Sequence, residues 1–309
     1  MTDDPRIHVS FEHLRRLKAD SRELSFLPRQ NALSVLNGRH QSRLRGRGLN
    51  FEEMRAYRRG DDIRSIDWKA TARTGSAHVR VFSEERDRPA LLVIDQRMSM
   101  FFGSVLNMKS VTAAEAAALA AHRILGSGDR VGGIVFNDDD QLEYAPRRSA
   151  HTSHALLKSI ASFNNLLHAE RPARTEPGRL NRVLKSVSRV AHHDHLVIIF
   201  SDFDGIDDAT HRHLSGIAQH NDLVLALVFD PSARLVGSGP KAVLSDGQLQ
   251  AQVDFANRRI TDALTQVASQ RLDRIIGWQT EIKLSVLPLS AAEQTTNQLK
   301  TLLGHRGAA

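Results

Sequence analysis

The sequence predicts an α/β protein built on a doubly wound, mostly parallel sheet, with an N-terminal helical and highly charged region before it. Two observations support this fold class. From residue 90 onward, short continuous apolar runs alternate with longer segments of helical periodicity, and such runs are typical of strands buried on both faces. Helices between parallel strands require right-handed crossovers, which place helices on both faces of the sheet. The 309-residue chain contains no cysteine, so its core forms without disulfides.

The N-terminal region has a different pattern. Phe11, Leu14 and Leu17 recur at helical spacing, and Pro28 is expected to end or kink that helix before a second helical piece. Polar residues with interspersed glycines follow and predict a loop, after which residues 51–88 are dense in charge. We therefore predict three parts: residues 1–88, a sheet domain at 89–303 and a tail at 304–309.

Within the sheet domain, apolar periodicity marks each element. The predicted strands are 90–95, 131–136, 196–201, 223–229 and 282–287, with an edge strand at 141–145. The predicted helices are 111–125, 151–163, 180–190, 209–219, 255–276 and 291–303. The helix at 111–125 is rich in alanine, and the glycines at 126 and 128 are expected to end it.

Two of the predicted strands end in an acid, Asp95 and Asp202. Open parallel sheets bind ligands beyond the carboxyl ends of their strands, so both carboxylates are expected near one crevice. Ser99 follows Asp95 by four residues, and together these oxygens would suit a hard cation such as Mg²⁺ or Mn²⁺. The alternative is that the two acids cap the loops or helices that follow their strands.

Composition and missing motifs exclude several classes of protein. The sequence has no P-loop, no G-x-G-x-x-G after a strand, no G-x-S-x-G and no H-E-x-x-H. The run His192–His195 lies in a predicted turn, where consecutive side chains point apart, so we interpret it as a polar turn rather than a metal cluster. No apolar run is long enough for a membrane helix and no signal segment is present, so a cytoplasmic protein is expected.

The net charge of +7 is concentrated in the first quarter of the chain. The arm Arg39–Arg47 carries four arginines without a nearby acid, which is the pattern of a polyanion-binding segment or of a basic loop. The aromatic residues that would stack on bases are absent from this arm, so nucleic acid is not the expected partner.

One long segment resembles a known family. Residues 48–74 read GLNFEEMRAYRRGDDIRSIDWKATART and resemble the signature of a bacterial family called domain of unknown function 58. The resemblance continues, in order, through Phe82–Arg86, Phe101–Ser104, Gly128–Gly132, Ser201–Phe203 and Phe229–Pro231. It implies a core similar to a von Willebrand factor A domain. Members are usually encoded with MoxR-class AAA+ ATPases, which implies a role as their partner or adaptor.

The resemblance also implies a metal-ion-dependent adhesion site, whose first motif is D-x-S-x-S. Here residues 95–99 read D-Q-R-M-S, so Arg97 stands in place of the first serine, and Gly178 stands where a threonine is expected. Asp202 matches the later acid. We therefore expect a degenerate site of Asp95, Ser99 and Asp202 that holds no metal. The Arg97 guanidinium, with its five donors, is expected to lie between the two acids instead.

The signature segment itself carries alternating charges, which favour either a structural network of arginine–carboxylate pairs or a docking surface for a partner. Asp67 is expected to pair with Arg64 or Arg73 and to hold an irregular segment in place. The candidate residues are Arg55, Tyr57, Gly60, Asp61, Asp62, Arg64, Asp67, Trp68 and Arg73.

Together these observations predict a non-enzymatic interaction protein. By resemblance, it would bind a MoxR-class AAA+ ATPase and present or help remodel a protein client. Neither a cofactor nor membrane insertion is expected. The alternatives are a metal-dependent hydrolase that uses Asp95 and Asp202, and a polyanion-binding protein that uses the arm Arg39–Arg47.

Overall fold

The computed structural model describes residues 4–24, 49–58, 63, 66–84, 89–170, 178–231, 242–245, 250–253 and 271–303. The chain forms two compact units. The larger unit combines Met1–Leu36 with Arg88–Ala309, and the smaller unit is Asn37–Asp87. The first helical segment therefore belongs with the sheet, whereas the sequence-based division grouped it with the charged signature segment.

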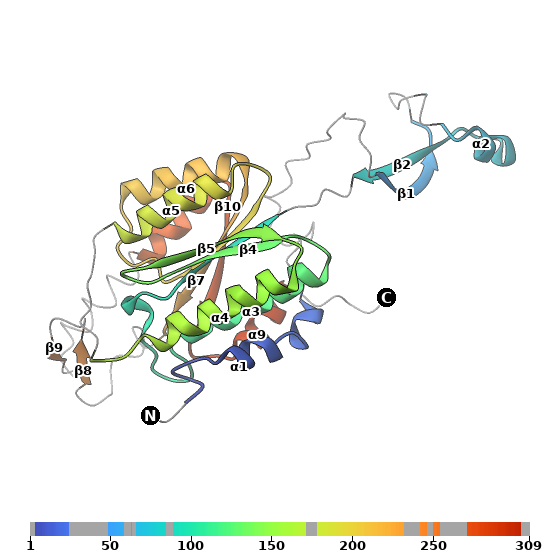
Figure 1. Cartoon of the computed structure of the whole chain (residues 1–309). Helices are drawn as coiled ribbons and strands as arrows, with labels where there is room; N and C mark the ends of the chain where they lie inside the picture. The colour runs from blue at the N-terminus through green and yellow to red at the C-terminus, as the bar shows by residue number, and fades with distance from the viewer. Residues whose placement is uncertain are drawn as a thin grey trace. The chain divides into compact units, whose positions relative to one another are not determined.

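The larger unit contains a six-stranded sheet in the order β10-β7-β6-β3-β4-β5 (Figure 1). Five strands run parallel, and β5 is an antiparallel edge strand beside β4. The strands are β3 (Ala90–Asp95), β4 (Val131–Phe136), β5 (Gln141–Arg147), β6 (Leu196–Ser201), β7 (Asp222–Phe229) and β10 (Leu284–Ser290). This arrangement confirms the predicted doubly wound sheet.

The strand order reverses between β3 and β6. The chain runs outward from β3 through β4 to β5, then returns to the other side of β3 and runs through β6 and β7 to β10. Ala90–Ile94 of β3 pair in register with Leu196–Phe200 of β6. The loops that follow these two strands diverge to opposite faces, which makes this point the switch point of the sheet.

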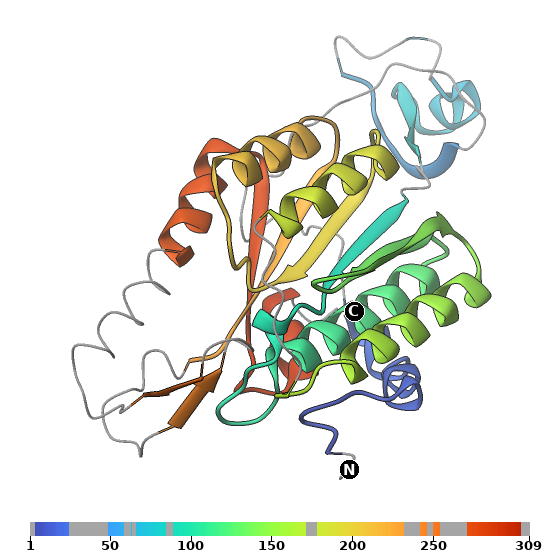
Figure 2. The same cartoon turned by 60° about the vertical axis from the view of Figure 1, so that its left-hand side comes forward.

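Helices cover both faces of the sheet (Figures 1 and 2). One face carries α1 (Phe11–Arg16), the 3-10 helix η1 (Asp20–Glu23), α3 (Lys109–Gly126), α4 (Ala150–Asn165) and α9 (Thr295–Leu303). The other face carries α5 (Arg179–Val190), α6 (Asp208–His220) and the helical residues 271–281. Alternate residues of β3 enter the two cores: Leu92 and Ile94 join the first, and Leu91 and Val93 the second.

Helix α3 lies over the centre of the sheet because its alanines allow a close approach. Seven of its alanines are fully buried, and a methyl group keeps a helix near the strands without leaving a void. The helix is followed by Gly128, which has a positive φ of 88°, as the glycines at this position predicted.

The N-terminal helix α1 packs on this layer through Leu14, which is fully buried. His13 Nε2 lies 2.6 Å from Glu115 Oε1 of α3, and this hydrogen bond raises the pKa of His13 above its ordinary value. Glu115 also accepts a hydrogen bond from the Thr295 hydroxyl of α9 at 2.6 Å. One partly buried carboxylate thus connects α1, α3 and α9.

The smaller unit is more regular than its sequence suggested. The sequence marked no helix or strand in the charge-dense residues 51–88, but β1 (Leu49–Ala56) and β2 (His78–Glu84) pair antiparallel, and α2 (Trp68–Thr74) lies between them in the chain. A bulge between Phe51 and Glu53 shifts the register of β1. The bulge interrupts the alternation of apolar and polar residues that marks a strand, which explains why β1 was not predicted.

Other differences are smaller. The structure contains a two-stranded sheet of β8 (Ala242–Ser245) and β9 (Gln250–Val253) that the sequence did not predict. The predicted helix 255–276 is described only from residue 271, where it is helical. The predicted second helical piece after Pro28 and the arm Arg39–Arg47 lie outside the described residues. In the described part of the chain, no helix is both long enough and apolar enough to span a membrane.

A test of the packing uses Gly132 in β4. A Cβ at this position would collide with the backbone carbonyl of Tyr144 at the irregularity where β4 meets β5. We expect Gly132→Ala to lower the free energy of unfolding by about 1–3 kcal/mol, because the backbone atoms cannot move aside. Urea denaturation of the full chain measures this change.

The matched control is Gly216→Ala in α6, where a Cβ would meet no atom within 4 Å. Because alanine favours a helix over glycine, this control should be neutral or stabilising, by up to about 1 kcal/mol. Equal effects of the two substitutions would contradict the packing described for β4.

Candidate functional site

The switch point between β3 and β6 brings together the two acids predicted from the sequence. Asp95 is the last residue of β3 and is completely buried, and Asp202 follows the last residue of β6 and is 4% exposed. The hydroxyl of Ser201 donates a hydrogen bond of 2.6 Å to Asp95 Oδ2. The ends of the two central strands are therefore joined through a carboxylate.

Arg97 binds the Asp95 carboxylate through the Nε and Nη2 side of its guanidinium. Its Nε lies 3.0 Å and its Nη2 2.8 Å from Asp95 Oδ2, and its backbone N–H donates to Oδ1 at 2.9 Å. The Nη2 atom also lies 3.8 Å from Asp202 Oδ1, an ion pair without a hydrogen bond. The guanidinium is therefore placed against one acid and faces the other, as the D-x-R-x-S pattern predicted.

A second cation, Lys109, completes the charge balance. It is the first residue of α3, and its Nζ donates to Asp202 Oδ2 at 2.6 Å. The Ser99 hydroxyl donates to the other oxygen of Asp202 at 3.3 Å. We call these six residues the carboxyl-edge network: Asp95, Arg97, Ser99, Lys109, Ser201 and Asp202. It contains two carboxylates and two cations.

The charges of this network stabilise the ionised forms of Asp202 and Arg97. Burial alone would raise the pKa of Asp202, but Lys109 and then Arg97 outweigh it, so the pKa of Asp202 lies well below its usual range. Burial alone would lower the pKa of Arg97, but Asp95 and Asp202 more than offset it and raise the pKa of the guanidinium. The network is therefore a closed and neutral set of charges.

These residues do not fit a divalent cation. Arg97 and Lys109 contact the same carboxylate oxygens that a metal ion would need, and each brings a positive charge that repels such an ion. Gly178, which stands at the position of the expected threonine, is the residue before α5 and offers no side-chain oxygen. Among the described residues, no group of three or more His, Asp or Glu side chains could hold a metal ion.

Further residues brace the loops around the network. The loop after β6 places Phe203 in the left-handed region with φ of 54°, although its ring is completely buried. Arg97 Nη1 donates to the Asp204 carbonyl at 3.2 Å, and Arg271 pairs with the Asp204 carboxylate. These contacts hold a backbone conformation that is unfavourable for a residue other than glycine. Burial raises the pKa of Asp138, which accepts a hydrogen bond from Met98 N at 2.8 Å.

Sequence reasoning missed Lys109, Asp138, Asp204 and Arg271. A signal for Lys109 was present, because a lysine in the first turn opposes the helix dipole and therefore suggests a carboxylate partner. Asp138 and Asp204 lie in loops, and Arg271 is the first described residue of a helix, so no periodicity relates the three to the two acids.

The structure changes the interpretation of Asp67 in the signature segment. Asp67 caps α2 by accepting hydrogen bonds from Lys69 N at 2.9 Å and Ala70 N at 3.0 Å. Of the two predicted partners, Arg73 is exposed in the last turn of α2 and forms no ion pair within the described residues, and Arg64 lies outside them. An aspartate directly before a helix has free backbone N–H groups within reach, which explains this outcome.

The other signature candidates are placed as follows. Tyr57 is half-buried after β1, and its backbone N–H donates to Ala77 O at 2.8 Å. Trp68 is the first residue of α2 and is 67% exposed. Arg55 lies in β1, opposite Val79 of β2. Gly60, Asp61, Asp62 and Arg64 lie outside the described residues.

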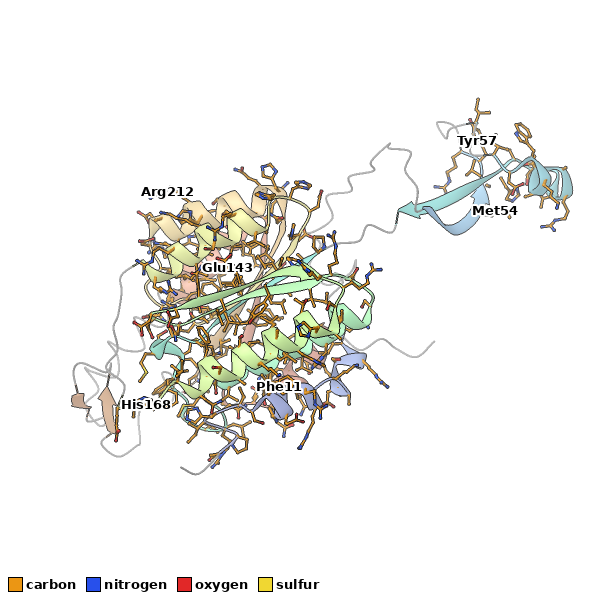
Figure 3. All side chains as sticks on the ribbon, viewed as in Figure 1. Phe11, Met54, Tyr57, Glu143, His168 and Arg212 are labelled. Carbon is orange, nitrogen blue, oxygen red and sulfur yellow. The ribbon has the colours of Figure 1, made fainter. Side chains whose placement is uncertain are left out.

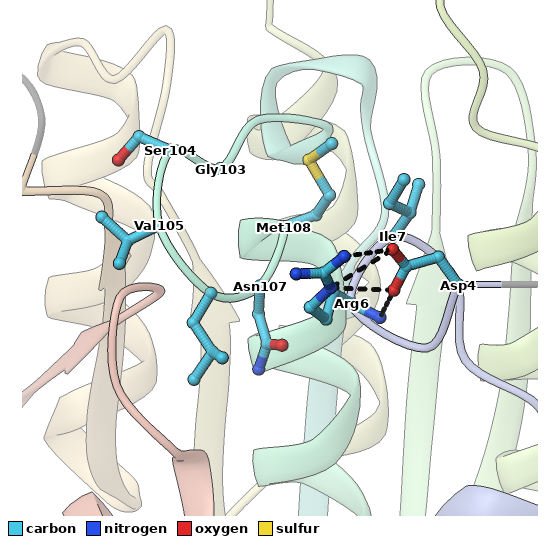
Figure 4. Close-up of a pocket in the computed structure, with 9 residues that line it drawn as sticks. Asp4, Arg6, Ile7, Gly103, Ser104, Val105, Asn107 and Met108 are labelled. Carbon is cyan, nitrogen blue, oxygen red and sulfur yellow. Dashed lines mark hydrogen bonds and ion pairs between the residues drawn. The ribbon is translucent and has the colours of Figure 1, made fainter.

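A separate pocket of about 210 Å³ lies between the N-terminal segment and the loop at residues 103–108 (Figure 4). Its charged groups, Asp4 and Arg6, bind each other, with Arg6 Nη2 2.7 Å from Asp4 Oδ2. The Met108 N–H donates to Arg6 O at 2.8 Å. These contacts hold the N-terminal segment against the loop. The charged side chains that line the pocket are paired with each other, so they do not form a catalytic site.

The histidine cluster at His192–His195 forms an exposed turn, in line with its sequence-based interpretation. His193 Nδ1 lies 3.0 Å from Asp194 Oδ2, and His195 Nδ1 lies 2.7 Å from the His193 carbonyl. The turn is thus held by local hydrogen bonds.

The Lys109–Asp202 pair can be tested by a double-mutant cycle. Lys109→Met removes the closest cation and leaves a buried carboxylate 3.8 Å from Arg97. We expect a loss of about 3–5 kcal/mol in the free energy of unfolding, because a buried charge without its partner is strongly destabilising. Chemical denaturation at neutral pH measures it.

The double variant Lys109→Met with Asp202→Asn is the control. It removes both charges and should recover part of the loss. A single variant within about 1 kcal/mol of the wild type would mean that the pair is solvated, which contradicts the burial described above.

Comparison with known proteins agrees with this organisation. A family model described as "Protein of unknown function DUF58" matches residues 53–272, which include the smaller unit's α2 and the whole carboxyl-edge network. Uncharacterized proteins of Mycobacterium bovis and of two Mycobacterium tuberculosis strains are 31% identical over 241 residues, which is 78% of this chain and 74% of theirs. The chain therefore belongs to the DUF58 family.

Proposed function

We propose that this protein is a non-enzymatic interaction module that acts in the cytoplasm as an adaptor or partner of a MoxR-class AAA+ ATPase, in the remodelling or maturation of a protein client. The ATPase partnership follows from the family resemblance. The observation that carries the non-enzymatic part is the closed carboxyl-edge network at the switch point of the sheet.

The switch point is where open α/β sheets bind and transform ligands. In this protein its polar groups bind each other. Ser201 is fully buried and donates to Asp95, and Ser99 donates to Asp202. A nucleophile needs access to its substrate and a base to activate it, and these hydroxyls are directed to carboxylates inside the network instead.

The same observation argues against the metal-dependent hydrolase. That mechanism requires a metal ion at Asp95 and Asp202 to activate a water molecule, and Arg97 and Lys109 already neutralise both acids. In this site Arg97 and Lys109 supply the positive charges. Such a site suits a protein that binds another protein through the surrounding surface, without a metal ion.

Metal independence can be measured by titration calorimetry with Mg²⁺ and Mn²⁺. We expect no saturable binding to the wild-type protein in the millimolar range, because the two internal cations repel the ion. The double variant Arg97→Ser with Lys109→Ala frees both carboxylates and should gain measurable binding. Saturable binding to the wild type that disappears in Asp95→Asn would contradict the proposal.

The adaptor role predicts a stable complex. The full chain and the MoxR-class ATPase of the same genome, purified separately and mixed, should co-elute in at least one nucleotide state. The rate of ATP hydrolysis should change on mixing. An AAA+ ATPase of a different class serves as the control. No association with ADP, with ATP or without nucleotide would contradict the proposed function.

A further inference from the structure

The smaller unit exposes a tryptophan at the start of a short helix. Trp68 is 67% exposed, whereas Trp278, the other tryptophan of the chain, is 5% exposed. Large aromatic side chains are seldom left in water without a use, and tryptophan is enriched among the residues that dominate binding energy in protein interfaces.

Three neighbours share the exposed side of α2 with Trp68. Ala72 lies four residues after Trp68, and Arg73 lies four residues after Lys69, so the two pairs form adjacent rows on the helix. All four side chains are exposed. In the described part of the chain, neither Lys69 nor Arg73 forms an ion pair. We call this set the tryptophan face: Trp68, Lys69, Ala72 and Arg73.

The tryptophan face is held in a fixed conformation. Asp67 caps the N-terminus of α2, and Gly75 ends the helix with a φ of 74°. On the opposite side, Ala70 is 6% exposed, and Val79 of β2 is 2% exposed. A rigid helix that presents an aromatic side chain loses little conformational entropy when it binds.

The rest of the smaller unit also leaves apolar surface in water. In its described part, Ile63 is 63% exposed and Met54 of β1 (labelled in Figure 3) is 42% exposed, while Ala70 and Val79 are the buried apolar residues. These side chains add exposed apolar surface to that of Trp68 in the described part of this unit.

We propose that the tryptophan face docks onto an acidic surface of the partner protein, with Trp68 entering an apolar pocket and Lys69 and Arg73 pairing with carboxylates around it. Charge complementarity selects this occupant, because the two cations form a row on one side of the aromatic ring and lack partners within the described residues. Ala72 leaves space for the pocket wall beside the ring. This inference rests on the proposed function and names the surface that carries it.

A nucleic acid fits this face less well. Single-stranded nucleic acids bind to several aromatic side chains along a basic groove, and this face offers one tryptophan on a helix of seven residues. A protein surface with one pocket and a few carboxylates matches the face in size and charge.

The test measures the dissociation constant of the full-length protein for the MoxR-class ATPase, at low and at physiological salt. Trp68→Ala should weaken binding by about 30-fold, the effect of losing a central interface residue. Lys69→Glu with Arg73→Glu should weaken it by about tenfold or more at low salt, and the effect should shrink as salt screens the charges.

Two controls match these changes in the larger unit. Val105→Ala removes an apolar side chain that is 61% exposed in the loop before α3. Lys185→Glu with Arg212→Glu reverses two exposed charges on α5 and α6. Both controls should stay within about twofold of the wild type. All variants replace exposed side chains, and thermal unfolding checks that they remain folded. If Trp68→Ala does not fold, the dissociation constants of Trp68→Phe and of the Lys69→Glu, Arg73→Glu variant replace it in the test.

The outcomes separate the two proposals. Wild-type affinity in the Trp68 and the Lys69/Arg73 variants overturns the tryptophan face and leaves the adaptor function in place. No binding by the wild-type protein overturns both. A single-stranded oligonucleotide that binds the wild type but not the charge reversal, and displaces the ATPase, would assign this face to nucleic acid and overturn the inference.

Discussion

Two buried ion pairs at the carboxyl edge of the central strands determine how the rest of the larger unit is arranged. Asp95 ends β3, Asp202 follows β6 and Lys109 begins α3. Arg97 joins the two acids and lies 5.8 Å from the ring of Phe136 at the end of β4. Each carboxylate needs its cation, since a buried charge without a partner is costly. The loop after β3 can therefore take few other paths, and the start of α3 is fixed over the sheet.

In this network, side chains of the same chain balance the two carboxylates. A bound metal holds its ligands only while the ion is available in solution. A guanidinium and an ammonium are part of every copy of the chain and are always present. Such a network is less adjustable than a metal site. A metal ion can exchange one ligand for an oxygen of a partner, whereas a paired arginine cannot do so without leaving a carboxylate unpaired.

Much of the larger unit could be predicted from the sequence, because its buried strands are continuous apolar runs. The predicted bounds of β3, β4 and β6 agree with the structure, and the two strand-end acids meet as expected. Lys109 was missed because it lies ahead of the apolar pattern that marked α3. The smaller unit could not be predicted in the same way. Its sequence is dense in charge, and the bulge in β1 removes the alternation that identifies a half-buried strand.

The smaller unit is inserted between two parts of the larger one, so both of its ends are attached to the same body. Its second connection leads directly into Ala90, the first residue of β3. A pull on the smaller unit would therefore load the central strand, which is paired at six positions with β4 and at five with β6. Separating β3 from its two neighbouring strands requires many backbone hydrogen bonds to break at the same time. A load on the smaller unit would thus reach this strand, which has the buried arginine pair of Asp95 at its far end.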